Sequence, residues 1–263
     1  MSALVLVLIG VLVGVTTVLF GFGGGFVTVP VITVADAALG SGAVRVAAAT
    51  SALVMLVNAV VATLATRREV LVRLRGREAL FVLLATGGAL GAAAARFTPG
   101  AVIRWGFVLY VAATVVDLLV RPGFRRPVSA GSRAARAHAV PTWLGAPIGG
   151  IAAFLGVGGS VLTVPLMRRA GASMPVAAAL ANPLTLVIVA PALLVSLVLQ
   201  GNAPDAAGLV GSVDVVSALA LLAGSLPVVV LLRRRPPRIP DALHAWTYVG
   251  LLVAAGATVA VTG

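Results

Sequence analysis

The chain has 263 residues, of which 60% are hydrophobic and 10% charged, and it contains no cysteine. Soluble domains carry about 45–50% apolar and about 25% charged residues, so this composition predicts a membrane protein, and the lack of cysteine excludes disulfides and thiolate metal sites. The net charge of +12 comes from arginines in short clusters between apolar segments. That distribution indicates membrane topology, so nucleic acid is not expected as a partner.

Eight apolar segments follow one another along the chain, at 3–40, 43–66, 78–97, 101–120, 141–171, 174–199, 208–232 and 242–262. Most of them have about 20–26 residues, which suits one α-helical crossing of a hydrocarbon core about 30 Å thick. The segments 3–40 and 141–171 are too long for one straight crossing and too short for two full ones. We therefore expect an all-α membrane protein with a bent or re-entrant element in each of these two segments.

Four groups of arginines separate the apolar segments, and the positive-inside rule predicts that all four are cytoplasmic. The groups are Arg67, Arg68, Arg73, Arg75 and Arg77; Arg121, Arg125, Arg126, Arg133 and Arg136; Arg168 and Arg169; and Arg233, Arg234, Arg235 and Arg238. The segment 141–171 has arginine groups on both sides, so it must enter and leave on the cytoplasmic side. If the segment 3–40 mirrors it from the outside, with the N-terminus outside, the two halves of the chain are inverted repeats.

The first expected repeat covers 1–138, including a central cytoplasmic loop at about 121–138, and the second covers 139–263. Each repeat is expected to hold one glycine-broken, re-entrant helical hairpin and three transmembrane helices. Together the two repeats form one integral membrane domain.

The two long segments carry a duplicated glycine motif. Gly21-Phe-Gly-Gly-Gly-Phe-Val-Thr-Val-Pro30 and Gly156-Val-Gly-Gly-Ser-Val-Leu-Thr-Val-Pro165 are identical at six of ten positions. We expect a loop at the glycines and a helix start at Thr-Val-Pro, with the threonine as N-cap and the proline in the first turn. Two helix N-termini near the membrane midplane would present free N–H groups to a common centre, which favours an anion.

The expected substrate site combines both motifs with polar residues at the head of the following helices. Its members are Gly23, Gly24, Gly25, Thr28, Thr50, Ser51, Gly158, Gly159, Ser160, Thr163 and Asn182. Two alternatives remain open. Glycines spaced as G-x-x-x-G, such as Gly10/Gly14, Gly87/Gly91 and Gly145/Gly149, also serve close helix packing. Hydroxyls in membrane helices also bond their own carbonyls, which we expect for Asn58, Thr63, Thr185 and Ser196.

The doubled motif, with Ala-Thr-Ser after its first copy, resembles the sulfite exporter TauE/SafE family over nearly the whole chain. The resemblance implies a transporter of sulfite or organosulfur anions in the bacterial inner membrane. Its motif positions fall on Gly21, Gly23, Gly24, Gly25, Val29, Pro30, Thr50, Ser51, Gly156, Gly158, Gly159, Val164 and Pro165. This chain departs from the pattern at Ser160 and at Ala181-Asn182-Pro183, where such proteins often have glycine and Gly-Thr-Ser. These departures bear on which anion fits.

Secondary transport by alternating access is the expected mechanism. H⁺ or Na⁺ is compatible with it as a coupling ion, and a homo-oligomer is compatible with it as the assembly. An anion channel and a membrane scaffold are the alternatives. The chain has no nucleotide-binding motif, and we expect neither a cofactor nor an enzymatic activity. We expect Asp117 to form a helix-end salt bridge, Asp214 to interact with a helix N-terminus, and Arg45, Arg96 and Arg104 to snorkel.

Overall fold

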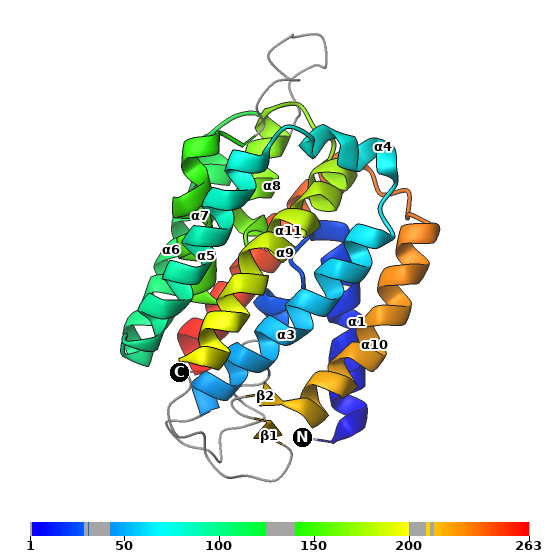
Figure 1. Cartoon of the computed structure of the whole chain (residues 1–263). Helices are drawn as coiled ribbons and strands as arrows, with labels where there is room; N and C mark the ends of the chain where they lie inside the picture. Colours follow the sequence, from blue (N-terminus) through cyan, green and yellow to red (C-terminus); the bar gives the residue numbers. More distant parts are fainter. Residues whose placement is uncertain are drawn as a thin grey trace.

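A computed structural model describes residues 2–28, 31, 43–124, 140–199, 209–210 and 213–262. The described part is a bundle of helices with one very short antiparallel ribbon (Figure 1). Its elements are α1 (Ala3–Phe20), α3 (Ala43–Leu64), α4 (Arg68–Leu71), η2 (Val72–Leu74), α5 (Glu78–Arg96), α6 (Gly100–Val120), η4 (Thr142–Leu144), α7 (Gly145–Leu155), α8 (Ser160–Arg169), α9 (Met174–Val198), β1 (Leu209–Val210), β2 (Val213–Asp214), α10 (Val215–Arg234) and α11 (Asp241–Thr262).

Six of the described helices are long and apolar enough to cross a membrane, namely α1, α5, α6, α9, α10 and α11. A seventh span is possible if α3 is counted together with the short helices that follow it, from which it is bent by 108°. The prediction of an all-α membrane protein is therefore confirmed at the level of fold class. One segment differs in detail, because the ribbon of β1 and β2 precedes α10 where an unbroken helix was expected.

Glycines set the closest helix contacts in the bundle. A Cβ atom on Gly10 of α1 would overlap the carbonyl oxygen of Leu221 on α10, and one on Gly87 of α5 would overlap that of Ala146 on α7. Neighbouring glycines on the same faces make equally close contacts: Gly14, Gly91, Gly149 and Gly224. For these G-x-x-x-G pairs, close helix packing is the role that the structure supports.

The two halves of the chain are interlocked. The first-half helix α5 packs against α7 and α9 of the second half, and the second-half helix α10 packs against α1 and α3 of the first half. Helices α3 and α9 meet in the centre of the bundle. The inverted orientation of the two halves stays a prediction, and so do the repeat boundaries.

Arginine-bearing segments gather at one end of the bundle, the upper end in Figure 1. Arg77, just before α5, donates to the carbonyl oxygen of Val140, just before α7. Arg169, at the end of α8, lies 2.6 Å from a carboxylate oxygen of Asp117, which also pairs with Arg121 at 3.2 Å. The expected helix-end salt bridge of Asp117 is confirmed. Both ends of the α7–α8 pair therefore lie at this arginine end, while α1 begins at the opposite end (Figure 1).

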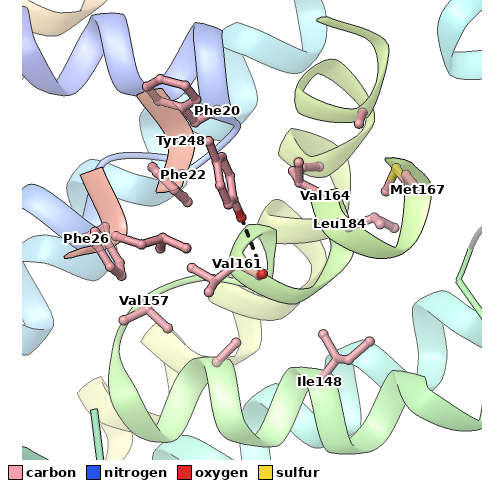
Figure 2. Close-up of a cluster of buried hydrophobic side chains, with 14 of the residues drawn as sticks. Phe20, Phe22, Phe26, Ile148, Val157, Val161, Val164, Met167, Leu184 and Tyr248 are labelled. Carbon is pink, nitrogen blue, oxygen red and sulfur yellow. Dashed lines mark hydrogen bonds between the residues drawn. The ribbon is translucent and has the colours of Figure 1, made fainter. Parts of the chain in front are cut away.

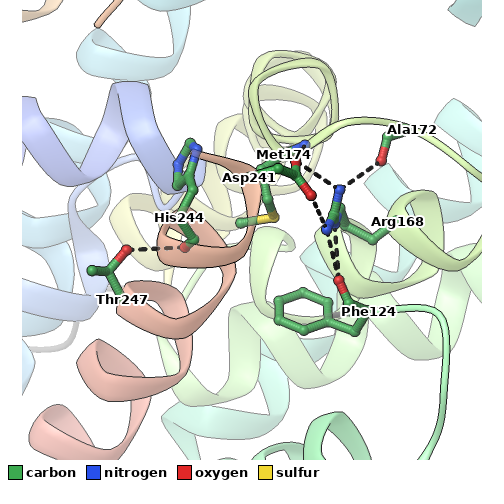
Figure 3. Close-up of polar contacts among 7 residues, drawn as sticks. All are labelled: Phe124, Arg168, Ala172, Met174, Asp241, His244 and Thr247. Atoms are coloured by element: carbon green, nitrogen blue, oxygen red, sulfur yellow. Dashed lines mark hydrogen bonds and ion pairs between the residues drawn. The ribbon is translucent and has the colours of Figure 1, made fainter. Parts of the chain in front are cut away.

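A buried ion pair closes the arginine end (Figure 3). The side chain of Arg168 is fully buried and donates to both carboxylate oxygens of Asp241, at 3.0 and 2.7 Å. The same guanidinium donates to the carbonyl oxygens of Phe124 and Ala172, and the backbone N–H of Met174 donates to Asp241. The hydrogen bonds of this planar group thus tie the end of α8 to Phe124, which follows α6, to Ala172 just before α9, and to Asp241 at the start of α11. The charge pattern alone gave Arg168 only a topological role.

The remaining isolated charges act at helix ends. Asp214 is the N-cap of α10 and accepts a hydrogen bond from the N–H of Ser217 at 3.0 Å, as expected for a helix N-terminus. Arg96 donates to the carbonyl oxygen of Leu199, and Arg104 donates to two carbonyls near the end of α11. The side chain of Arg45 lies outside the described residues, as does Asp36.

Candidate functional site

The two glycine motifs break their helices in the same way. Helix α1 ends at Phe20 and α7 ends at Leu155, and each is followed by a glycine in the left-handed region, Gly21 with φ of +73° and Gly156 with φ of +70°. Two residues later the pattern repeats, with +63° at Gly23 and +69° at Gly158. Because only glycine adopts these angles without a steric cost, the sequence dictates a loop here. The predicted helix breaks are confirmed.

Both following helices begin earlier than predicted. Helix α8 begins at Ser160 with Gly159 as N-cap, and its first i→i−4 bond runs from the N–H of Thr163 to the carbonyl of Gly159 at 3.0 Å. In the first half the N–H of Thr28 bonds the carbonyl of Gly24 at 2.9 Å. The prediction that both threonines are N-caps is therefore wrong, because glycine takes the cap position and places each threonine one turn inside the helix.

The structure describes only one of the two motif prolines, Pro165. Pro165 lies inside α8 rather than in its first turn, so its predicted position is also wrong. Val29 and Pro30 of the first motif lie outside the described residues.

The two glycine turns meet at the centre of the bundle. A Cβ on Gly25 would lie 2.9 Å from the carbonyl oxygen of Gly156, so the two motifs touch directly. The methyl carbon of Thr185 would lie 3.2 Å from a Cβ on Gly23 and 3.1 Å from one on Gly158. A single threonine of α9 therefore lies against both turns, and the duplicated motifs build one centre rather than two.

Helices α3 and α9 line this centre along one face each. On α3 the face carries Ser51, Met55 and Asn58, spaced four and three residues apart, and the thioether of Met55 contacts both turns. The amide nitrogen of Asn58 would lie 3.4 Å from a Cβ on Gly24. On α9 the face runs from Ala178 past Thr185. This spacing brings one stripe of each helix to the glycine turns.

Polar atoms of this centre are buried without partners. Six residues whose side chains are fully buried carry an oxygen or nitrogen with no hydrogen bond to any described residue: Ser51, Asn58, Ser160, Thr163, Asn182 and Thr185. Most buried polar atoms in proteins are paired, and leaving one unpaired costs about 1–3 kcal/mol. A concentration of unpaired polar atoms, most of them able to donate, beside two helix N-termini is typical of a binding site rather than of a packing core.

The structure brings most of the predicted site residues to this centre. Both glycine sets and the first turn of α8 are there, and Ser51 and Asn182 lie on the lining helices, where the amide of Asn182 donates to its own helix at 3.0 Å. Two members have hydroxyls that already hold a hydrogen bond. The hydroxyl of Thr50 accepts a hydrogen bond from the N–H of Asp214 at 2.9 Å, and that of Thr28 donates to the carbonyl of Gly24 at 3.1 Å.

Sequence reasoning missed Thr185, Asn58 and Met55. The expectation that hydroxyls bond their own helix is confirmed for Ser196, which donates to Ala192. It is wrong for Thr63 and Thr185, whose hydroxyls have no hydrogen-bond partner among the described residues, and for Asn58, whose side-chain oxygen accepts from Ser225 at 2.9 Å. Spacing was the available signal, because Thr185 follows Asn182 by three positions and therefore shares its helix face.

An aromatic cluster packs beside the first turn of α8 (Figure 2). Phe22 stacks on Phe26 with ring centroids 5.1 Å apart, and the ring of Tyr248 lies 5.1 Å from that of Phe22. The hydroxyl of Tyr248 donates to the carbonyl oxygens of Ser160 and Val161, both at 3.3 Å. The first turn of α8 is thus held by apolar packing and by one hydroxyl.

The electrostatics of the centre favour a small anion. The side chains that lie against the glycine turns are neutral, and the first turn of α8 adds N–H groups that precede its first helical hydrogen bond. No group of three or more metal-ligating side chains occurs among the described residues. A cavity of about 400 Å³ lies between α6, α7 and α8 and follows α8 from Val161 to Arg169, with a largely apolar lining.

No curated protein and no solved structure matches the chain at a significant level. The model of one protein family, sulfite exporter TauE/SafE, matches residues 6–259, which is nearly the entire sequence. The chain therefore belongs to the sulfite exporter TauE/SafE family.

Proposed function

We propose that the protein is a secondary transporter that carries a small anion, sulfite or an organosulfur anion, across the bacterial inner membrane by alternating access. Two features of the protein do not depend on this proposal. The family is one of membrane transporters, and the apolar helices make the chain a multi-pass membrane protein. The identity of the anion, the midplane site and the mechanism belong to the proposal.

The meeting of both glycine turns at Thr185 is the observation that carries the proposal. Each turn precedes a helix N-terminus, which carries about half a positive charge and several free N–H groups. In a site of low dielectric constant these dipoles bind an anion without a buried arginine. The unpaired hydroxyls of Ser160, Thr163 and Thr185 supply further donors for the oxygens of a sulfite or sulfonate group.

The packing of the helices supports an inverted arrangement. The α7–α8 pair has both of its ends at the arginine end, which the positive-inside rule assigns to the cytoplasm. This pair then enters the membrane from the cytoplasm and returns, and the α1 segment enters from the outside. The exchange of α5 and α10 between the halves is the contact pattern that such a repeat produces.

The burial of the site supports alternating access. Ser51, Ser160, Thr163 and Thr185 are all fully buried, so an anion reaches them only when the helices around them move apart. A re-entrant pair that opens toward one side at a time provides this movement, coupled to H⁺ or Na⁺. We expect no cofactor and no catalysis.

Flux into proteoliposomes tests the proposal. The purified protein is reconstituted, and uptake of labelled sulfite, thiosulfate, sulfoacetate, sulfate and taurine is followed under imposed pH and Na⁺ gradients. We expect saturable uptake of at least one sulfur anion and counterflow. An ohmic anion current would identify the protein as a channel rather than a carrier. The absence of flux for every solute would favour a membrane scaffold.

A matched pair of variants ties flux to the site. Thr185→Val keeps the shape of the side chain and removes the hydroxyl at the glycine turns. Ser196→Ala removes a hydroxyl from the same helix that is bonded to its own carbonyl. We expect loss of uptake in the first variant only, and equal uptake in both would refute the assignment of the site.

A further inference from the structure

Helix α8 contains a proline that leaves one of its carbonyls without a helical donor. Pro165 has no N–H, so it cannot bond the carbonyl oxygen of Val161, four residues earlier. Val161 lies in the first turn of α8, beside the glycine turn, and is fully buried. A buried carbonyl without a donor is costly, so this position needs a partner from another element.

Tyr248 of α11 provides that partner. Its hydroxyl lies 3.3 Å from the carbonyl oxygen of Val161 and 3.3 Å from that of Ser160, and Figure 2 shows it directed at this turn. The side chain is fully buried. A residue that is 83 positions away from the proline thus replaces the missing N–H.

The ring of Tyr248 is held independently of its hydroxyl. Ring centroids of Phe20, Phe22 and Phe124 lie 5.8, 5.1 and 5.4 Å from that of Tyr248. These contacts fix the direction in which the hydroxyl points. They also mean that a phenylalanine can keep the packing and remove only the hydrogen bond.

We propose that Tyr248 is a positioning residue of the anion site, which acts by pairing the carbonyl that Pro165 leaves free and so fixing the N–H groups of the first turn of α8. This inference rests on the proposed anion site. Without the hydroxyl, the carbonyl of Val161 tilts away to find another donor, and the N–H groups of the same turn lose their direction. Binding of the anion then weakens although no group that touches it has changed.

The first half of the chain lacks this hydroxyl. The stretch Trp105-Gly-Phe107-Val matches Trp246-Thr-Tyr248-Val, and the ring of Phe107 lies 5.3 Å from that of Phe26, the residue that corresponds to Val161 in the glycine repeat. Phenylalanine packs at the same place but donates no hydrogen bond. Among the described residues, the tyrosine hydroxyl bonds α8, and the phenylalanine at the matching position packs against Phe26 without such a bond.

A double-mutant cycle between Tyr248 and Pro165 tests the inference. Pro165→Ala restores an N–H that can bond the carbonyl of Val161, and this makes the tyrosine hydroxyl dispensable. The dissociation constant of sulfite is measured by calorimetry in detergent for the wild type, Tyr248→Phe, Pro165→Ala and the double variant. We expect Tyr248→Phe to weaken binding about tenfold alone, and less than twofold when alanine replaces the proline.

Tyr110→Phe is the matched control. It removes another buried tyrosine hydroxyl, which has no partner among the described residues, from α6. Tyr110 lies near enough to Tyr248 to interact with it electrostatically, but its hydroxyl makes no hydrogen bond to α8, so we expect sulfite binding to stay unchanged in this variant.

The outcomes separate the inference from the proposed function. If Tyr248→Phe binds sulfite as tightly as the wild type, the inference is wrong and the proposed function is unaffected. The same holds if Tyr248→Phe weakens sulfite binding equally with proline and with alanine at position 165. A wild type that binds none of the sulfur anions refutes the proposed function. If Tyr248→Phe fails to fold, recovery of a monodisperse protein by the added Pro165→Ala supports the pairing, and failure of both variants overturns it.

Discussion

Replacing Gly158 by alanine should weaken anion binding by a calculable amount. With φ of +69°, alanine at this position costs about 1–2 kcal/mol in backbone strain. Its Cβ would lie 3.1 Å from the methyl carbon and 3.6 Å from the hydroxyl oxygen of Thr185, so the threonine must shift. A hydrogen bond from that hydroxyl to an anion is worth about 1.5–3 kcal/mol, so its loss weakens binding about 10- to 150-fold.

Gly76→Ala is the control for the backbone strain that alanine causes at a positive φ. Gly76 has φ of +72°, and a Cβ there meets nothing within 4 Å. Both variants should lose similar thermal stability in detergent, and only Gly158→Ala should lose affinity for sulfite in calorimetry. If Gly158→Ala binds the anion like the wild type, or if both variants lose affinity to the same degree, the glycine turn does not position Thr185 for binding.

Three further predictions concern stability. Asp241→Ala removes the partner of the fully buried Arg168 and should lower the free energy of unfolding by about 3 kcal/mol. This is the low end of the range for buried pairs, because the Asp241 side chain is 36% exposed. The unfolding midpoint in detergent measures the loss, and an unchanged midpoint would contradict a structural role for the pair. Gly87→Leu should separate α5 from α7 and abolish monodisperse protein, since the backbone of Ala146 leaves no room; a well-behaved variant would contradict this packing. Thr185→Val should raise the midpoint slightly, because it removes a buried hydroxyl that has no partner among the described residues, and a lower midpoint would indicate that the hydroxyl stabilises the fold.

Backbone sterics explain which parts of the site could be predicted from sequence. The breaks after α1 and α7 were predictable because glycine alone tolerates the left-handed angles at Gly21 and Gly156. The starts of the following helices were not, because threonine is a good N-cap and nothing local shows that Gly159 takes that position first. The same holds for Thr185, where a local rule about hydroxyls competed with a contact between distant segments.

Charge patterning predicted the arrangement of the helix ends and the local salt bridge of Asp117, but not the ion pairs between distant segments. The arginine groups placed the ends of α6 and α8 together, and the pairing of Arg169 with Asp117 agrees with that placement. The buried pair of Arg168 with Asp241 had no such signal, because Asp241 opens a helix 73 residues later and only the folded chain brings the two together. The sidedness of the arginine end stays a prediction.

Because the two halves are interlocked, the first helix must wait for its packing partner to be synthesised. Helix α1 ends at Phe20, and its glycine face is covered by α10, which begins only at Val215. At about 5–20 residues per second, the ribosome needs on the order of 10–40 s to supply that partner. During this interval the glycine face of α1 lacks the helix that covers it in the folded protein, so the contact between α1 and α10 forms only late in synthesis.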